Sequence, residues 1–250
     1  MTFSVITCTY NAQDVLQRTL DSVARQTYTG VQHLIIDGAS KDDTMRLVMD
    51  YDEKCKASDH DVLIVSAKDD GLYDAMNKGI ALAKGEYLVF LNAGDTFHAD
   101  DTLEKIAAQV EDNAVGVIYG NTDVVDNDGH FLHVRRLQPP EKLTWKSFRH
   151  GMLVCHQAFY ARTDIAKAVK YNLRYKLSAD VDWCIRVMKA AQKKGLVLHN
   201  THMTLCNYLD GGMSVQNHKA SLMERFRIMS HHYGFVTTVL MHFWFIFRKK

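Results

Sequence analysis

The sequence lacks the features that mark small disulfide-rich, zinc-binding or secreted proteins. Two of its 250 residues are prolines, and its five cysteines, an odd number, form no CxxC pair. This pattern argues against a disulfide framework and against a zinc site, and it favours a reducing cytoplasm. The N-terminus has neither a basic segment nor a long apolar core, so we expect no signal peptide. A formal net charge of +1 gives no indication of nucleic-acid binding.

Two common nucleotide-binding fingerprints are also missing, the GxGxxG loop and the P-loop. A diphosphate bound by this chain would therefore need another source of positive charge. A divalent cation on carboxylate oxygen meets that need, because Mg²⁺ and Mn²⁺ prefer such ligands. We expect Asp95, in a turn that follows an apolar run, to be the metal ligand.

The hydrophobic pattern predicts an α/β fold. Apolar, β-rich segments at 3–7, 31–37, 62–66 and 86–91 alternate with helical patterns at 12–26, from 40 onward, and at 73–84 and 100–110. This alternation predicts a mostly parallel, Rossmann-like sheet with right-handed crossovers, flanked by helices.

After residue 115 strands and helices no longer alternate regularly, and we expect a mixed α+β half that shares the sheet. We expect short strands at 117–119, 123–125, 131–134 and 158–160, a hairpin turn at 127–129, and helices at 143–148 and 181–194. The predicted divisions are 1–115 for the alternating half, 116–215 for the mixed half, and 216–250 for a C-terminal helical segment.

Polar side chains follow each of the four expected parallel strands. Ligands of open parallel sheets bind beyond the carboxyl ends of the strands. Any one of these residues alone would be weak evidence, since Asp, Asn and Gly are ordinary turn residues. Together they predict a site, whose members are Thr7, Thr9, Tyr10 and Asn11, then Asp37, Gly38, Ser40 and Asp43, then Asp69 and Asp70, and finally Asn92 and Asp95.

Five segments resemble those of the family 2 glycosyltransferases with the GT-A fold, a group that includes enzymes of bacterial surface-polysaccharide assembly. The resemblance covers roughly residues 2–210. It rests on TCTYN at 7–11, IDGASKDDT at 36–44, DGLYDAMNKG at 70–79, LNAGD at 91–95 and SADVDW at 178–183.

The resemblance implies donor-binding roles for the first four segments. Thr9 and Tyr10 would line the base pocket, and Asp37 would hydrogen-bond uracil or another base. The other implied donor-binding residues are Thr7, Asn11, Asp70, Asp74, Lys78, Asn92, Ala93 and Gly94. Asp95 would hold Mn²⁺ or Mg²⁺ with the diphosphate, although Asn92 stands where the family often has an acid.

The resemblance of the fifth segment implies which residue acts as the catalytic base. Asp180 would deprotonate an acceptor hydroxyl, so that attack opposite the nucleotide inverts the anomeric carbon without a covalent intermediate. Ala179 stands where the family often has Glu. The implied donor is a UDP-sugar, and the acceptor is a glycan or a polyprenyl-diphosphate-linked glycan. The acceptor-side residues would be His156, Gln157, Asp182 and Trp183, and 207–214 would be a closing loop.

Simpler interpretations stay open for some of these residues. Asp182 would also serve as a charge at a helix N-terminus, and His156 as a hydrogen-bonded core histidine. A nucleotidyltransferase would need a Gly- and Lys/Arg-rich loop after the first strand, which is absent. A non-catalytic binding subunit fits Asn92 and Ala179, but it does not explain why Asp37, Asp70, Asp95 and Asp180 occur together.

The C-terminus is unusually aromatic. Residues 235–247 are almost all apolar and are followed by Arg248, Lys249 and Lys250. The run is shorter than the roughly 20 residues that span a bilayer. It suits a helix on a membrane surface, a last helix packed on the core, or a dimer helix. We expect a cytoplasmic protein at the inner face of the cytoplasmic membrane.

Overall fold

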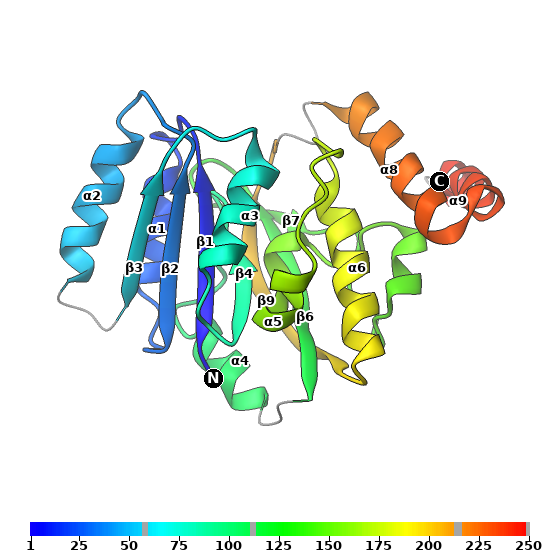
Figure 1. Cartoon of the computed structure of the whole chain (residues 1–250), viewed down its shortest axis with the longest axis horizontal. Coiled ribbons are helices and arrows are strands. Elements are labelled where there is room, and N and C mark those ends of the chain that lie inside the picture. Colours follow the sequence, from blue (N-terminus) through cyan, green and yellow to red (C-terminus); the bar gives the residue numbers. More distant parts are fainter. Residues whose placement is uncertain (57–59, 111–113, 213–216, 249–250) are drawn as a thin grey trace.

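The computed structural model describes residues 1–56, 60–110, 114–212 and 217–248. Within them the strands form one mixed sheet in the order β3-β2-β1-β4-β8-β6-β9-β5, with β7 paired to β6 (Figure 1). The sheet runs through both predicted halves without a break. None of the helices in these ranges combines the length and hydropathy that a membrane span requires.

The parallel part of the sheet matches the prediction. It consists of β1 (Phe3–Thr9), β2 (Val31–Asp37), β3 (Asp61–Ser66) and β4 (Tyr87–Phe90). All three pairings are parallel, and the register aligns Thr9 with Asp37 and Asp37 with Ser66. The carboxyl ends of these strands therefore lie at one edge, where the polar residues were expected.

Alternation along β2 explains why helices cover both faces of this part of the sheet. Leu34 and Ile36 belong to the larger core, with α3 (Leu72–Leu82), whereas Ile35 between them packs with α1 (Leu16–Ala24) and α2 (Thr44–Cys55). Successive strand residues point to opposite faces, so a fully apolar strand needs cover on both. Helix α1 begins later than expected, because the chain turns at Asn11, where φ is +45°.

The second half corrects the prediction in two places. The expected strands at 117–119 and 123–125 are one strand, β6 (Val115–Val125), with β7 (Phe131–Val134) after the predicted hairpin turn. A long strand, β9 (Val197–Leu209), was not predicted; it pairs with β6 and includes 207–209 of the expected closing loop. Residues 213 and 214 of that loop lie outside the described residues.

The remaining elements complete the sheet and its cover. Strand β8 (Phe159–Arg162) runs antiparallel between β4 and β6, and the short β5 (Thr96–Phe97) pairs with β9. The helices are α4 (Thr102–Gln109), the 3₁₀ turns η1 (Trp145–His150) and η2 (His156–Ala158), α5 (Thr163–Ala168), α6 (Ala179–Lys193), α8 (His218–Tyr233) and α9 (Phe235–Arg248). In Figure 1, α8 and α9 lie at the end of the molecule beyond α6.

Gly79 allows α3 to lie close against β1. A Cβ at this position would come within 2.5 Å of Ile6 Cγ2, and the side chain of a β-branched residue has little freedom to move. We expect Gly79→Ala to lower the free energy of unfolding by about 1–3 kcal/mol, although alanine is the better helix former. Urea denaturation would measure this, with Ala81→Ser on the exposed face of α3 as a control. A more stable Gly79→Ala protein would contradict the packing argument.

Candidate active site

Asp37, at the end of β2, is excluded from solvent and holds the ends of β2 and β3 together. Its Oδ2 accepts hydrogen bonds from the Ser66 hydroxyl at 2.6 Å and from the Ser40 backbone N–H at 3.0 Å, and its Oδ1 accepts from the Ser40 hydroxyl. These bonds occupy three of the roughly four lone-pair sites of a carboxylate. One site is left for a donor at the edge.

The loops after β1 and β2 are joined through Asn11. Its backbone N–H donates to Ser40 Oγ at 2.8 Å, and its Oδ1 accepts from the Lys41 backbone N–H at 2.9 Å. Asn11 is thus committed to the loop structure. Its neighbour Tyr10 is 62% exposed and free to offer a ring face.

Gly38 lies between Tyr10 and Asp69. A Cβ at Gly38 would lie 3.3 Å from Tyr10 Cδ2 and 2.9 Å from Asp69 Oδ2. The glycine therefore brings the exposed ring from the first strand end close to the carboxylate from the third. A larger residue at position 38 would push the Asp69 carboxylate and the Tyr10 ring apart, so the shape of this part of the edge depends on Gly38.

The predicted residues on α3 and just before it form one connected group. The Asp70 backbone N–H donates to Asp74 Oδ2 at 3.2 Å, and the same oxygen pairs with Lys78 Nζ at 3.3 Å. Lys78 Nζ also donates to the Lys68 carbonyl at 3.1 Å. Asp70 itself is exposed. The structure thus brings Asp70, Asp74 and Lys78 together at the third strand end.

Asp95 is buried and held from the second half of the chain. Its Oδ2 accepts from Gln157 Nε2 at 2.7 Å, and its Oδ1 accepts from the Leu209 backbone N–H at 2.9 Å. Burial raises the pKa of Asp95 to about 7, even though these two hydrogen bonds act in the opposite direction. Gly94, at φ +98°, packs closely enough on Leu209 that a Cβ would come within 2.5 Å of it.

Two buried side-chain oxygens at this edge have no hydrogen-bond partner in the described part of the chain. They are Thr9 Oγ1, after β1, and Asn92 Oδ1, after the adjacent β4. Native proteins leave few buried polar atoms unpaired, so each such atom calls for an explanation. A ligand at the edge supplies one. Ala93, between Asn92 and Gly94, packs instead on the apolar cluster beneath α1 and α2.

Asp180 lies in the first turn of α6 and is half-buried. Its Oδ1 accepts one hydrogen bond, from the Tyr73 hydroxyl at 3.3 Å. Tyr73 sits in α3 between Asp70 and Asp74, so it links the predicted base to the predicted donor segment. The carboxylate keeps most of its hydrogen-bonding capacity for other partners.

A buried aromatic group connects Asp180 with Asp95. Tyr73 stacks on Tyr171 at 5.3 Å, and Tyr171 hydrogen-bonds to His156, the neighbour of the Gln157 that holds Asp95. Burial lowers the pKa of His156 to about 4, against the opposing effect of the Asp180 charge, so the ring is neutral at pH 7. His156 stacks on Phe90 at 4.8 Å. Both His156 and Gln157 therefore face inward, where they support the site.

Three predicted site residues do not reach the edge. Asp182 and Trp183 are 2% and 0% exposed, and Asp182 is bound by Arg186 and His232 on the side of α8. Thr7 is also fully buried, because β1 continues to Thr9. The polar atoms of Thr7 and Asp182 are taken up by hydrogen bonds within the fold, and Trp183 stacks on Tyr171. These contacts give the three side chains a structural role.

Thr7 also fixes the state of His33. The Thr7 hydroxyl donates to the Leu91 carbonyl at 2.8 Å, so His33 Nε2 must donate to Thr7 and Nδ1 must accept from Tyr51. Burial and the nearby His60 lower the pKa of His33 to about 3.

A buried neutral histidine makes stability depend on pH. Since the unfolded chain binds a proton near pH 6.5 and the folded chain does not, the contribution of His33 is complete above pH 6.5 and is lost as pH falls toward 3. We expect the stability lost between pH 7.5 and 5 to be about 2 kcal/mol smaller in His33→Asn than in the wild type. Urea denaturation at both pH values measures this, and equal losses would contradict it.

Sequence reasoning did not single out Tyr73 or Ser66. Tyr73 was visible as part of the 70–79 segment, but only the fold shows that it meets Asp180. Ser66 hydrogen-bonds Asp37, and no local sequence signal marks it as a partner of that carboxylate.

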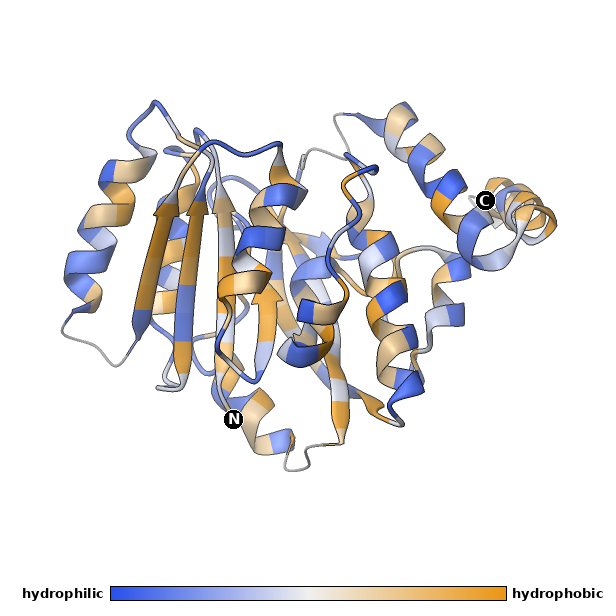
Figure 2. Cartoon of the chain, viewed as in Figure 1, coloured by the Kyte–Doolittle hydropathy of each residue, from blue (hydrophilic) through white to orange (hydrophobic). Residues whose placement is uncertain are grey.

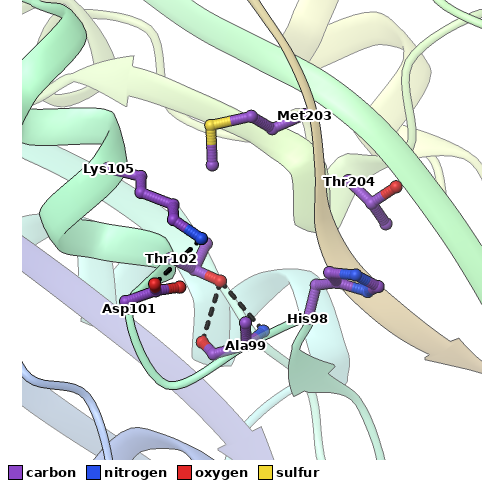
Figure 3. A pocket seen from close by; sticks show the side chains of 7 residues that line it. All are labelled: His98, Ala99, Asp101, Thr102, Lys105, Met203 and Thr204. Atoms are coloured by element: carbon purple, nitrogen blue, oxygen red, sulfur yellow. Dashed lines mark hydrogen bonds and ion pairs between the residues drawn. The ribbon is translucent and has the colours of Figure 1, made fainter.

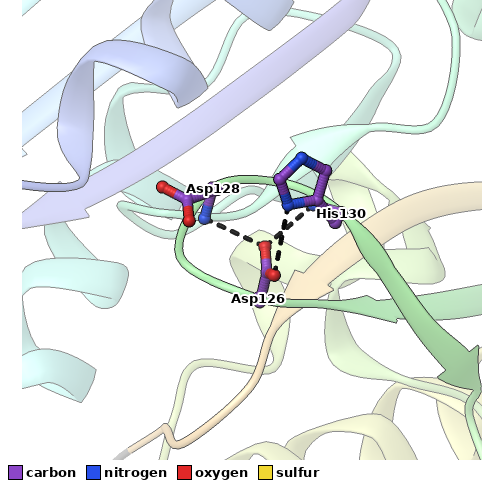
Figure 4. Close-up of side chains that lie close together, drawn as sticks. All are labelled: Asp126, Asp128 and His130. Carbon is purple, nitrogen blue, oxygen red and sulfur yellow. Dashed lines mark hydrogen bonds and ion pairs between the residues drawn. The ribbon is translucent and has the colours of Figure 1, made fainter.

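Two other features lie apart from this group of residues. In the described ranges, one group of side chains has the types and spacing of metal ligands: Asp126, Asp128 and His130. These residues form the tight turn between β6 and β7, where Asp126 Oδ1 accepts hydrogen bonds from the backbone N–H groups of Asp128 and His130 (Figure 4). A cavity of about 340 Å³ lies between α4 and β9 (Figure 3). None of the predicted site residues lines it; its lining consists of His98, Ala99, Asp101, Thr102, Lys105, Met203 and Thr204.

A family model described as Glycosyl transferase family 2 matches residues 4–169. The chain belongs to glycosyltransferase family 2. It is 34% identical to the PGL/p-HBAD biosynthesis glycosyltransferase of Mycobacterium tuberculosis over 215 residues, which are 85% of this chain and 78% of the relative. It is 28% identical to the amylovoran biosynthesis glycosyltransferase AmsB of Erwinia amylovora, over 81% of this chain and 70% of that one. In this family 2 glycosyltransferase, Asp180 lies outside the segment that the family model matches.

Solved structures confirm the GT-A fold. S. aureus TarS in complex with UDP-GlcNAc superposes with a TM-score of 0.71 at 19% identity, over 92% of this chain. The chain spans 64% of that TarS chain. The mannosyltransferase PcManGT from Pyrobaculum calidifontis, in complex with GDP-Man and Mn²⁺, gives a TM-score of 0.63 at 14% identity, over 96% of this chain and 73% of that one. At such identities the likeness concerns the fold alone.

Proposed function

We propose that this glycosyltransferase moves a sugar from a UDP-sugar to a hydroxyl of a glycan or lipid-linked glycan, with inversion at the anomeric carbon. The observation that carries the proposal is the continuous network from Asp95 through Gln157, His156, Tyr171 and Tyr73 to Asp180. It joins an oxygen-rich turn suited to the diphosphate with a half-buried carboxylate suited to the acceptor.

On the donor side, Tyr10 and Asp37 would bind the base, and Asp70, Asp74 and Lys78 would surround the nucleotide and ribose. Tyr10 offers an exposed ring, and Asp37 keeps one free acceptor site. The UDP-GlcNAc complex of TarS supports a UDP-sugar as the first donor to test. The GDP-Man complex of PcManGT is the reason to test GDP-sugars as well.

The turn after β4 fits a divalent cation. Asn92 Oδ1 is buried and unpaired among the described residues, and Asp95 supplies a carboxylate within three residues of it. Oxygen ligands of this kind suit Mg²⁺ and Mn²⁺. When bound, the cation would neutralise charge on the diphosphate leaving group. Gln157 and Leu209 orient Asp95 for that contact.

On the acceptor side, Asp180 would accept the proton of the attacking hydroxyl as a general base. Tyr73 orients its Oδ1, and the other oxygen is free to approach the hydroxyl directly or through one water. The names of the relatives, a PGL/p-HBAD biosynthesis glycosyltransferase and an amylovoran biosynthesis glycosyltransferase, support a role in glycan biosynthesis. A polyprenyl-diphosphate-linked acceptor would place the enzyme at the inner face of the cytoplasmic membrane.

Nucleotide release from a panel of UDP-, GDP- and dTDP-sugars, each with Mn²⁺, Mg²⁺ or EDTA, tests this function. Slow, metal-dependent hydrolysis of one donor is expected and would identify the sugar. If no donor is hydrolysed and no nucleotide raises the melting temperature, the proposal is wrong, and the alternative of a non-catalytic binding subunit becomes the better account.

A further inference from the structure

Helix α8 holds the segment that leads into the catalytic helix α6. The Glu224 carboxylate accepts hydrogen bonds from three successive backbone N–H groups, those of Lys176 at 2.8 Å, Leu177 at 2.8 Å and Ser178 at 3.0 Å. The Ser178 and Ser221 hydroxyls lie 3.0 Å apart. An acidic group is well placed at the N-terminal end of a helix, where the free backbone N–H groups point outward.

A second contact from α8 lies on the other side of Asp180. His232 Nε2 donates to Asp182 Oδ1 at 2.8 Å, and the two side chains are 4% and 3% exposed. Burial raises the pKa of Asp182, but the hydrogen bond from His232 and the charge of Arg186 outweigh this effect and lower it. Asp180 lies between the two contacts, at 178 and 182, so the position of α8 fixes the position of the base.

Helix α9 folds back on α8 and exposes an apolar stripe. Its inner face carries the buried Thr238 and His242, which packs on Phe226 of α8 at 5.0 Å. Its outer face carries apolar side chains at intervals of four, three and four residues, which is one face of a helix. These are Val236, Leu240, Phe243 and Phe247, exposed by 71%, 63%, 58% and 75%. Figure 2 shows that much of the α9 ribbon has the colours of hydrophobic residues.

The charge of this part of the chain is strongly asymmetric. Residues 217–250 contain six Lys and Arg and one acidic residue, Glu224, which gives +5. Since the whole chain carries +1, residues 1–216 carry −4. A second copy of the chain would bring +5 against +5, whereas an anionic surface is complementary to it. Aromatic side chains beside cations are typical of helices that lie on such surfaces.

From this stripe and this charge we propose that α8 and α9 form a docking surface for an anionic lipid bilayer, tied through Glu224 to the base Asp180. The exposed face of α9 enters the headgroup region, and the net charge of 217–250 favours anionic headgroups. Docking then holds α8, and with it the N-terminal end of α6, at the membrane where a lipid-linked acceptor is presented. The role of Asp180 in this inference rests on the proposed function, but the lipid contact does not.

Vesicle sedimentation tests the docking surface without any sugar donor. We expect the full chain to bind vesicles of mixed phosphatidylglycerol and phosphatidylcholine at least about tenfold more tightly than pure phosphatidylcholine vesicles. Leu240→Asn with Phe243→Asn should lower binding to both kinds of vesicle, because it removes apolar contact area from the exposed face of α9. Phe131→Asn on β7, where the ring is 60% exposed, is the matched control and should bind as the wild type does.

Equal vesicle binding by the wild type and the double variant would overturn the docking proposal. The proposal would also be overturned if the wild type were a dimer in sedimentation velocity and the double variant a monomer, since the stripe would then be an interface between copies. Unchanged melting temperatures of both variants would show that a loss of binding is not a loss of folding.

The link between Glu224 and Asp180 is tested by measuring hydrolysis of the donor identified by the panel in Glu224→Gln. We expect kcat for donor hydrolysis to fall about fivefold or more with the donor KM unchanged, because misplacing the base affects the reaction and not donor binding. Glu104→Gln on α4 is the control. A lower melting temperature with unchanged kcat would make Glu224 a purely structural residue and remove the tie. An inactive wild type would instead count against the proposed function, whatever the vesicle result.

Discussion

Asp180→Asn should lower kcat for sugar transfer by about 10²–10⁴-fold, with the donor KM nearly unchanged. The amide keeps the shape of the side chain and the contact with Tyr73 but cannot take a proton from the acceptor, and general-base catalysis is typically worth this much. The fold should persist, because within the described residues the carboxylate makes one hydrogen bond, and that bond is long. Steady-state kinetics and a melting curve of the same preparation measure both effects.

Asp101→Asn is the matched control for this experiment. Asp101 is another carboxylate at the start of a helix, but it pairs with Lys105 on the surface of α4 and is not part of the proposed network from Asp95 to Asp180. Its kcat should stay within about twofold of the wild type, as expected for a surface ion pair. If Asp180→Asn retained wild-type kcat as well, another group would have to be the base.

Asp95→Asn should lower kcat by about 10²–10³-fold and remove the response to Mn²⁺ or Mg²⁺, since it removes the charged oxygen from a buried electrostatic site. The single variant also places an amide N–H₂ against the Gln157 amide. Adding Gln157→Glu restores a donor opposite an acceptor at the 2.7 Å contact.

The double variant separates structure from chemistry. We expect Asp95→Asn with Gln157→Glu to recover the melting temperature lost by the single variant but not the turnover. Treatment of the wild type with EDTA should lower turnover in the same way, and added Mn²⁺ should restore it. A double variant that regains metal-dependent turnover would mean that the site needs a carboxylate at either position of this pair and does not need Asp95 itself.

The first half of the fold was predictable because its signals are local. Strands β1 to β4 are apolar runs separated by helical patterns, so both their bounds and their parallel pairing follow from the sequence. Strand β9 was missed because its sequence, with His199, Asn200, Thr201 and His202, has little of the β-branched and aromatic character of strands. Pairing with β6 outweighs that weak preference.

The site was predictable to the extent that it lies at strand ends. Asp37, Asp70, Asp74, Lys78, Asn92 and Asp95 lie where the topology places them. The partners of Asp95 were not predictable, since Gln157 and Leu209 lie 62 and 114 residues away along the chain. Thr7 was assigned to the site because β1 was expected to end there. Two more strand residues bury it, and the same long-range packing buries Asp182 beneath α8.

The anomeric configuration of the transferred sugar tests the central claim most directly. With an α-linked UDP-sugar from the panel and methanol as a small acceptor, the methyl glycoside cannot mutarotate, so proton NMR gives the configuration of the bond as it was formed. A single displacement assisted by Asp180 predicts the β-glycoside, and this product should be lost in Asp180→Asn. An α-glycoside would contradict the account, because retention requires a different mechanism at this site.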